Sequence, residues 1–191
     1  MDSRAHGQSG GEFCTYGFYE SQDISKIVDY IKVKESNLPI GIWGSSMGGA
    51  IAILALEKDK RLQFGLIQST FTDLNQIVFD YKKRILKGFG SRVLTNYALE
   101  RAGKIANFNP QKVRPIEAVK NIEQPIILAH GDADKNITYQ YGQQLFDSLK
   151  TMDKEFYLVK NAGHIGLWDA GGKAFETKMM GFIERQLSRE K

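Results

Sequence analysis

The chain has 191 residues, of which 42% are hydrophobic and 25% are charged. This composition is typical of one globular domain and excludes the disordered, collagen-like and disulfide-rich classes. The 26 Lys and Arg residues exceed the 22 Asp and Glu residues by a net charge of +4. These charges are spread along the chain, which argues against a nucleic-acid-binding protein.

The densest basic stretch contains Lys82, Lys83, Arg84, Lys87 and Arg92. Such a run can contact phosphates or an anionic membrane face, but it is usually the solvated side of a helix. No apolar run reaches the roughly 20 residues of a membrane span. The polar start of the chain does not resemble a signal peptide, which indicates a cytoplasmic protein if Met1 is the true start.

Hydrophobic periodicity then predicts strands and helices in alternation. A glycine-rich loop opens the chain, and the first helix begins near Ser21. Later helices are expected over residues 50–56, 74–81, 93–102, after a capping Thr138, and around 175–183. Strands are expected over residues 40–43, 64–67, 125–129 and 156–159. This order predicts an α/β fold with a mostly parallel sheet and helices on both faces.

Residues 44–49 read G-S-S-M-G-G, a G-x-S-x-G string between a predicted strand and a predicted helix. That setting is the one in which the motif marks a nucleophilic serine, here Ser46. The backbone N–H of Met47, at the start of the helix, can stabilise a developing oxyanion. An inert glycine-rich turn is the alternative interpretation of the string.

A nucleophilic serine needs a base and a third group that orients the base. Of the three histidines, His164 follows a strand and is the candidate base, whereas His130 is interpreted as structural and His6 lies in the opening loop. Asp132 and Asp134 share the loop after another strand, and composition does not separate them as the acid. The order serine, acid, histidine matches the α/β-hydrolase order.

Four segments in this order resemble α/β hydrolases of the broad serine-aminopeptidase-like (peptidase S33-like) and esterase-like group. Residues 2–11 resemble the D-x-R-G-H-G-x-S loop, with Ala5 replacing a usual glycine, and residues 41–49 resemble the nucleophile elbow. Residues 130–134 resemble the H-G-x-x-D acid loop, and residues 163–164 resemble the histidine loop. The resemblance implies Asp134 as the acid, with Asp132 as second choice, and a short helical cap-position segment at about 75–118.

In these relatives several strands precede the loop that residues 2–11 resemble, and one of them leads to the second oxyanion donor. We therefore expect a single domain, residues 1–191, that is N-terminally truncated relative to the family. The strand from Ile40 would then be an exposed apolar edge. Loss of one oxyanion donor typically lowers turnover by about a hundredfold to a thousandfold.

The expected function is hydrolysis of an ester, thioester or amide through Ser46, His164 and Asp134, with a small-molecule or peptide acyl substrate. No cofactor or metal is expected. Acyl transfer to a nucleophile other than water would use the same triad. The alternative from another class is a catalytically inactive, truncated hydrolase that acts as a binding module.

Overall fold

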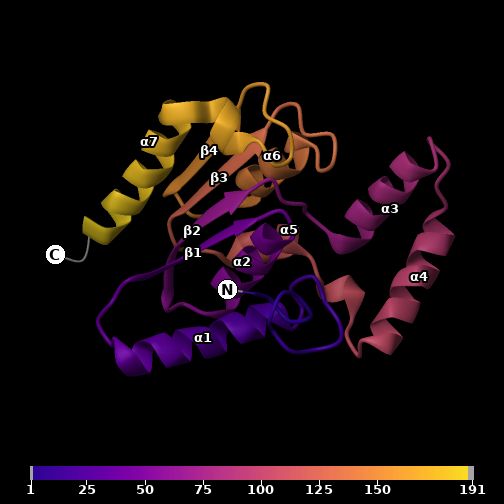
Figure 1. Ribbon diagram of the computed structural model, residues 1–191, viewed down its shortest axis with the longest axis horizontal. Coiled ribbons are helices and arrows are strands. Elements are labelled where there is room, and N and C mark those ends of the chain that lie inside the picture. Colours follow the sequence, from indigo (N-terminus) through magenta and orange to yellow (C-terminus); the bar gives the residue numbers. More distant parts are fainter. Residues whose placement is uncertain (1, 189–191) are drawn as a thin grey trace.

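The computed structural model describes residues 2–188 and contains one parallel sheet in the order β1-β2-β3-β4 (Figure 1). The strands are β1 (Ile40–Ser45), β2 (Leu62–Gln68), β3 (Ile126–Gly131) and β4 (Lys154–Val159). Each expected strand is therefore present. All four extend one or two residues beyond the predicted bounds at one or both ends, and β3 also begins one residue later than predicted. All three strand pairs are parallel.

The helices alternate with these strands, as the periodicity predicted. They are α1 (Glu20–Lys34), α2 (Met47–Lys58), α3 (Leu74–Ile85), α4 (Arg92–Ile105), α5 (Pro115–Ala118), α6 (Tyr139–Ser148) and α7 (Leu167–Ser188), with short 3-10 turns η1 (Pro110–Lys112) and η2 (Val119–Asn121). Thr138 precedes α6, but its hydroxyl contacts the side chain of Gln140 and makes no capping bond. A left-handed Gly172, with φ of +52°, interrupts α7.

The two faces of the sheet bury separate apolar clusters, because successive strand residues point in opposite directions. Ile126 and Leu128 of β3 join the cluster beneath α2 and α6, whereas Ile127 and Ala129 join the cluster beneath α7. Helices therefore cover both faces, and the expected fold class is confirmed.

Strand β1 lies at one edge of the sheet and pairs with β2 alone among residues 2–188. Trp43 on this strand is half exposed and packs against Trp168 of α7 at 5.3 Å between ring centroids. The edge position agrees with the expected exposed strand. The truncation inferred from the family resemblance stays a prediction.

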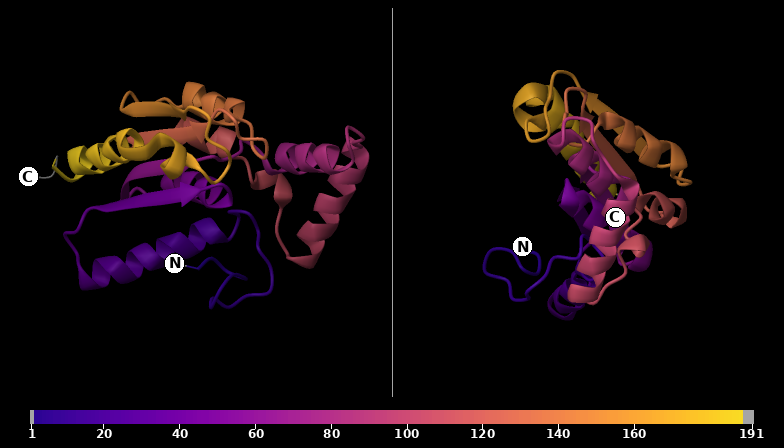
Figure 2. Two further views of the ribbon diagram at one scale, coloured as in Figure 1. Left: turned by 45° about the horizontal axis from the view of Figure 1, so that its top comes forward. Right: turned by 90° about the vertical axis from the view of Figure 1, so that its right-hand side faces the viewer.

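Helices α3 and α4 form a hairpin between β2 and β3, at the expected cap position. Figure 2 shows this hairpin extending away from the sheet. Asp73 caps α3 by accepting a hydrogen bond from the Gln76 N–H, and Ser91 caps α4 by accepting one from the Leu94 N–H. Across residues 2–188, every helix is too short or too polar to span a lipid bilayer.

The buried face of α7 yields a stability prediction. Phe175 is fully buried and its ring contacts those of Trp168 and Tyr157. We expect Phe175→Ala to lower the free energy of unfolding by about 3–5 kcal/mol, because it opens a cavity beneath the sheet. Met180→Ala on the same helix is the control, since Met180 is 43% exposed. Urea unfolding midpoints measure both, and equal losses would contradict this packing.

Candidate active site

Ser46 occupies the turn between β1 and α2 in an unusual backbone conformation, with φ of +54° and ψ of −121°. Non-glycine residues adopt positive φ at a cost of about 1–3 kcal/mol unless their surroundings hold them there. Here the Ser46 N–H donates to the Gln68 carbonyl at 2.8 Å, and the Thr70 hydroxyl donates to the Ser46 carbonyl at 2.7 Å. Strand β2 and the residues just beyond it therefore hold the turn from both sides.

Glycines allow the turn to be this tight. A Cβ at Gly44 would lie 2.1 Å from the Gly48 carbonyl oxygen, and one at Gly49 would lie 2.8 Å from the Thr70 Cβ. Gly48 is different, since nothing lies within 4 Å of its Cβ position. The G-x-S-x-G string thus contains glycine at position 44 for a steric reason.

His164 lies in the loop after β4 and connects the other two predicted side chains. Its Nε2 atom is 2.9 Å from the Ser46 Oγ, and its Nδ1 atom is 2.8 Å from the Asp134 Oδ2. Because the carboxylate accepts, Nδ1 carries a proton, and Nε2 is then free to accept the serine proton. The fold therefore brings Ser46, His164 and Asp134 into one hydrogen-bonded line.

The Asp134 carboxylate is buried but well satisfied. Its Oδ1 atom accepts the backbone N–H groups of Asn136 at 2.8 Å and Ile137 at 2.9 Å. Burial raises the pKa of the Asp134 carboxyl, but hydrogen bonds from His130, His164 and these two N–H groups outweigh it and hold that pKa well below its usual range. Asp134 is therefore ionised at neutral pH. These hydrogen bonds stabilise the folded state above the unfolded Asp134 pKa of about 4, and this stabilisation is lost as the pH falls through the lower folded pKa.

The loops after β3 and β4 are bonded to one another, which sets the distance between His164 and Asp134. The Asp132 Oδ1 accepts the Asn161 N–H at 2.6 Å, and the Ala133 N–H donates to the Ala162 carbonyl at 3.1 Å. A Cβ at Gly131 would lie 2.2 Å from that carbonyl oxygen, so only glycine permits the approach. Asp132 thus contacts the histidine loop, whereas Asp134 contacts the histidine itself.

The remaining candidates lie where their sequence positions suggested. Met47 is the first residue of α2, so its N–H has no carbonyl one helical turn earlier to bond. His130 is buried and its Nε2 lies 2.8 Å from the Ile137 carbonyl oxygen, so it donates there. The exposed His6 lies in the opening loop with its Nδ1 atom 2.9 Å from the Arg4 carbonyl oxygen.

A cavity of about 290 Å³ opens beside Ser46. Sequence reasoning missed its walls, because they come from four separate parts of the chain. Apart from Ser46 and Met47, the lining side chains are aromatic or aliphatic: Tyr16, Phe71, Leu74, Ile77, Val78, Tyr81 and Ile137. Four of them belong to α3, so the hairpin forms one wall of the cavity.

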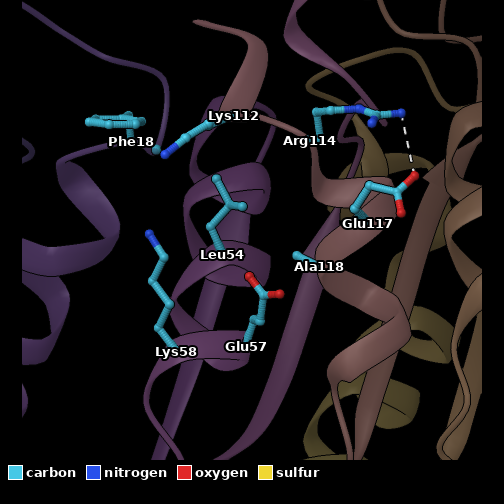
Figure 3. A pocket seen from close by; sticks show the side chains of 9 residues that line it. Phe18, Leu54, Glu57, Lys58, Lys112, Arg114, Glu117 and Ala118 are labelled. Atoms are coloured by element: carbon cyan, nitrogen blue, oxygen red, sulfur yellow. Dashed lines mark ion pairs between the residues drawn. The ribbon is translucent and has the colours of Figure 1, made fainter. Parts of the chain in front are cut away.

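A second hollow, of about 350 Å³, lies between α2, α5 and the end of the opening loop. Figure 3 shows Lys58 and Lys112 on one side of Leu54, and the ion-paired Arg114 and Glu117 on the other. Its charged groups have both signs, and no residue of the Ser46, His164 and Asp134 line contributes to it. Of these two cavities, only the one beside Ser46 adjoins the Ser46, His164 and Asp134 line.

A strained serine at a strand-to-helix turn of an α/β sheet is the arrangement of the α/β-hydrolase superfamily. Residues 14–190 match the prolyl oligopeptidase family, and the chain belongs to that family. The superfamily expected from the motifs is thus confirmed, while its narrower serine-aminopeptidase branch stays a prediction.

The chain is also similar in sequence to a bacterial protein. YqkD of Bacillus subtilis, an uncharacterized protein, is 26% identical over 188 residues, which are 96% of this chain. The chain spans about 60% of the length of YqkD.

Two solved structures share the fold. The esterase Pf2001 of Pyrococcus furiosus superposes with a TM-score of 0.75 at 22% identity, covering 96% of this chain and 68% of the esterase. The acylaminoacyl peptidase of Pyrococcus horikoshii gives a TM-score of 0.63 at 22% identity, over 91% of this chain and 28% of the peptidase.

The glycines at the turn yield a matched pair of variants. We expect Gly44→Ala to lower the free energy of unfolding by about 1–3 kcal/mol, because its Cβ meets backbone atoms that cannot move independently. Gly48→Ala has room for its Cβ and should leave stability unchanged or raise it by up to about 1 kcal/mol. Urea unfolding of both variants tests this, and a destabilised Gly48→Ala beside an unaffected Gly44→Ala would refute the packing argument.

Proposed function

We propose that this chain is a serine hydrolase that cleaves an ester, thioester or amide bond. The single observation that carries the proposal is that His164 bonds Ser46 through Nε2 and Asp134 through Nδ1. A serine hydroxyl is a weak nucleophile until a neighbouring base takes its proton, and a base oriented by a carboxylate does so best.

In the proposed reaction the Ser46 Oγ attacks the carbonyl carbon of the substrate while His164 takes the hydroxyl proton. The Met47 N–H faces the negative charge that develops on the carbonyl oxygen. The imidazolium then gives its proton to the leaving group, and the acyl group stays on Ser46. Water, deprotonated by His164, attacks this acyl-enzyme and releases a carboxylic acid. Asp134 stays ionised and stabilises the imidazolium in both halves of the reaction.

The cavity walls favour substrates with an apolar acyl group. Apart from Ser46 and Met47, its lining side chains are all aromatic or aliphatic. The similar solved structures include an esterase and an acylaminoacyl peptidase, so relatives of this fold support both oxygen and nitrogen leaving groups. We therefore propose hydrolysis of short- to medium-chain acyl esters or of amides with an apolar acyl residue.

Labelling with a fluorophosphonate tests the nucleophile. We expect the probe to modify Ser46, located by peptide mapping, and to leave Ser46→Ala unmodified, because the probe reacts with serines activated by a base. Asp134→Asn should label roughly a thousandfold more slowly, since an amide in that place favours the wrong histidine tautomer.

Asp132→Asn is the matched control for the acid, because an amide oxygen can still accept the Asn161 N–H. Its labelling rate should stay within about threefold of the unsubstituted chain. Equal losses of labelling rate in Asp132→Asn and Asp134→Asn would contradict the assignment of Asp134 as the acid. A folded chain that takes no label at Ser46 would instead indicate a binding module without hydrolase activity.

The cavity yields a prediction about acyl-chain length. Val78→Trp should lower kcat/KM for a hexanoyl ester about tenfold or more while changing the acetyl ester little, because the larger ring fills space that only the longer chain uses. Ile85→Trp is the control, since Ile85 lies on the same helix but outside the cavity. The ratio of the two kcat/KM values is the readout, and an unchanged ratio in Val78→Trp would exclude this cavity as the acyl site.

A further inference from the structure

The tip of the α3–α4 hairpin, residues 85–94, exposes a cluster of large apolar side chains. Figures 1 and 2 show the tip as the part of the hairpin farthest from the sheet. Its apolar residues are between 48% and 81% exposed: Ile85, Leu86, Phe89, Val93 and Leu94. Contiguous exposed apolar groups on a folded chain commonly mark a binding surface.

Cations surround this cluster without balancing carboxylates. Residues 81–99 contain Lys82, Lys83, Arg84, Lys87 and Arg92 and no Asp or Glu. Within residues 2–188, none of these five cations forms an ion pair. The two arginines stack on the rings of Tyr81 and Phe79, at 4.1 and 4.0 Å from the ring centroids. The tip and the adjoining last turn of α3 are therefore apolar and carry only positive charges.

The base of the hairpin is held firmly, so the tip is presented in a defined position. Asp80 of α3 accepts a hydrogen bond from the buried Tyr141 of α6. The Arg84 Nη1 donates to the Lys135 carbonyl at 2.7 Å. Arg114 pairs with Asp73, the cap of α3, at 3.0 Å. These bonds connect α3 to the body of the molecule, while residues 86–94 extend beyond them.

We propose that the hairpin tip docks on an anionic lipid surface. Apolar side chains that enter the headgroup region, with Lys and Arg beside lipid phosphates, are the two attractions that hold peripheral proteins on membranes. A second copy of the chain fits less well, because a symmetric contact would bring two sets of five cations together. Nucleic acid would pair with the lysines but would leave the apolar side chains in water.

Docking would also bring the cavity beside Ser46 close to the lipid surface. Leu74, Ile77, Val78 and Tyr81 of α3 line that cavity, and Ile85 and Leu86 at the end of α3 begin the tip. A tip seated in lipid would therefore place the cavity close to molecules with acyl chains. This link rests on the proposed function, whereas the docking itself does not.

Vesicle flotation tests docking directly, on the unsubstituted chain and on Ser46→Ala. The vesicles contain phosphatidylcholine alone or with about one-third phosphatidylglycerol. We expect both chains to bind the anionic vesicles at least tenfold more tightly than the neutral ones, and binding to weaken as salt is raised. Because Ser46→Ala tests binding without the nucleophile, failure of the hydrolase proposal would leave this result intact.

Matched variants assign the binding to the tip. Replacing Lys82, Lys83 and Lys87 with Gln should weaken binding to anionic vesicles by about tenfold or more. Replacing Lys26, Lys34 and Lys150 with Gln removes the same charge elsewhere and should change it less than about threefold. Phe89→Ser should weaken binding severalfold, whereas Val33→Ser, at a similarly exposed position on α1, should not. Circular dichroism verifies that each variant is folded.

Several outcomes would overturn the proposal. One is absence of binding to either vesicle, and another is an equal effect of the tip and control lysine sets. Sedimentation that shows a dimer broken by Phe89→Ser would assign the tip to self-association. Binding to a DNA duplex that depends on the tip lysines and not on Phe89 would assign it to nucleic acid.

Discussion

The positive φ of Ser46 is the constraint on which the site depends. A serine in that conformation is unfavourable in isolation, so the surrounding bonds must hold it, and they come from Gln68 and Thr70 at the end of the neighbouring strand. The parallel pairing of β1 with β2 is therefore part of the site and not only of the scaffold. Without this strand pairing, nothing would hold Ser46 in the backbone conformation that directs its hydroxyl out of the turn.

Two loops give the second half of the arrangement. Asp132 and Gly131 fasten the loop after β3 to the loop after β4, which brings His164 to the carboxylate of Asp134. Hydrogen bonds from His130, from His164 and from the N–H groups of Ile137 and Asn136 keep that carboxylate ionised despite its burial. The orientation of the His164 ring therefore depends on backbone contacts between loops as much as on the three side chains that form the line.

The sequence could predict what is encoded locally. Strands and helices follow from apolar spacing, and Ser46 follows from its glycines. The choice between Asp132 and Asp134 needed the family resemblance, because both are turn aspartates and only their partners differ. The cavity could not be predicted, since Tyr16, Phe71 and α3 meet only when the chain is folded. The last helix was expected only around residues 175–183, so its first turn from Leu167 and the positive-φ break at Gly172 were not predicted.

Helix α3 connects these features, because its apolar residues do not all face one way. Its residues from Leu74 to Tyr81 that line the cavity are Leu74, Ile77, Val78 and Tyr81, whereas Ile85 in its last turn is exposed to solvent. A helix that served only as a wall would be more soluble with polar residues at its last turn. Exposed apolar side chains beside lysines that form no ion pair are unfavourable in water and favourable at a lipid headgroup layer. The same helix thus connects the proposed docking surface with the cavity beside Ser46.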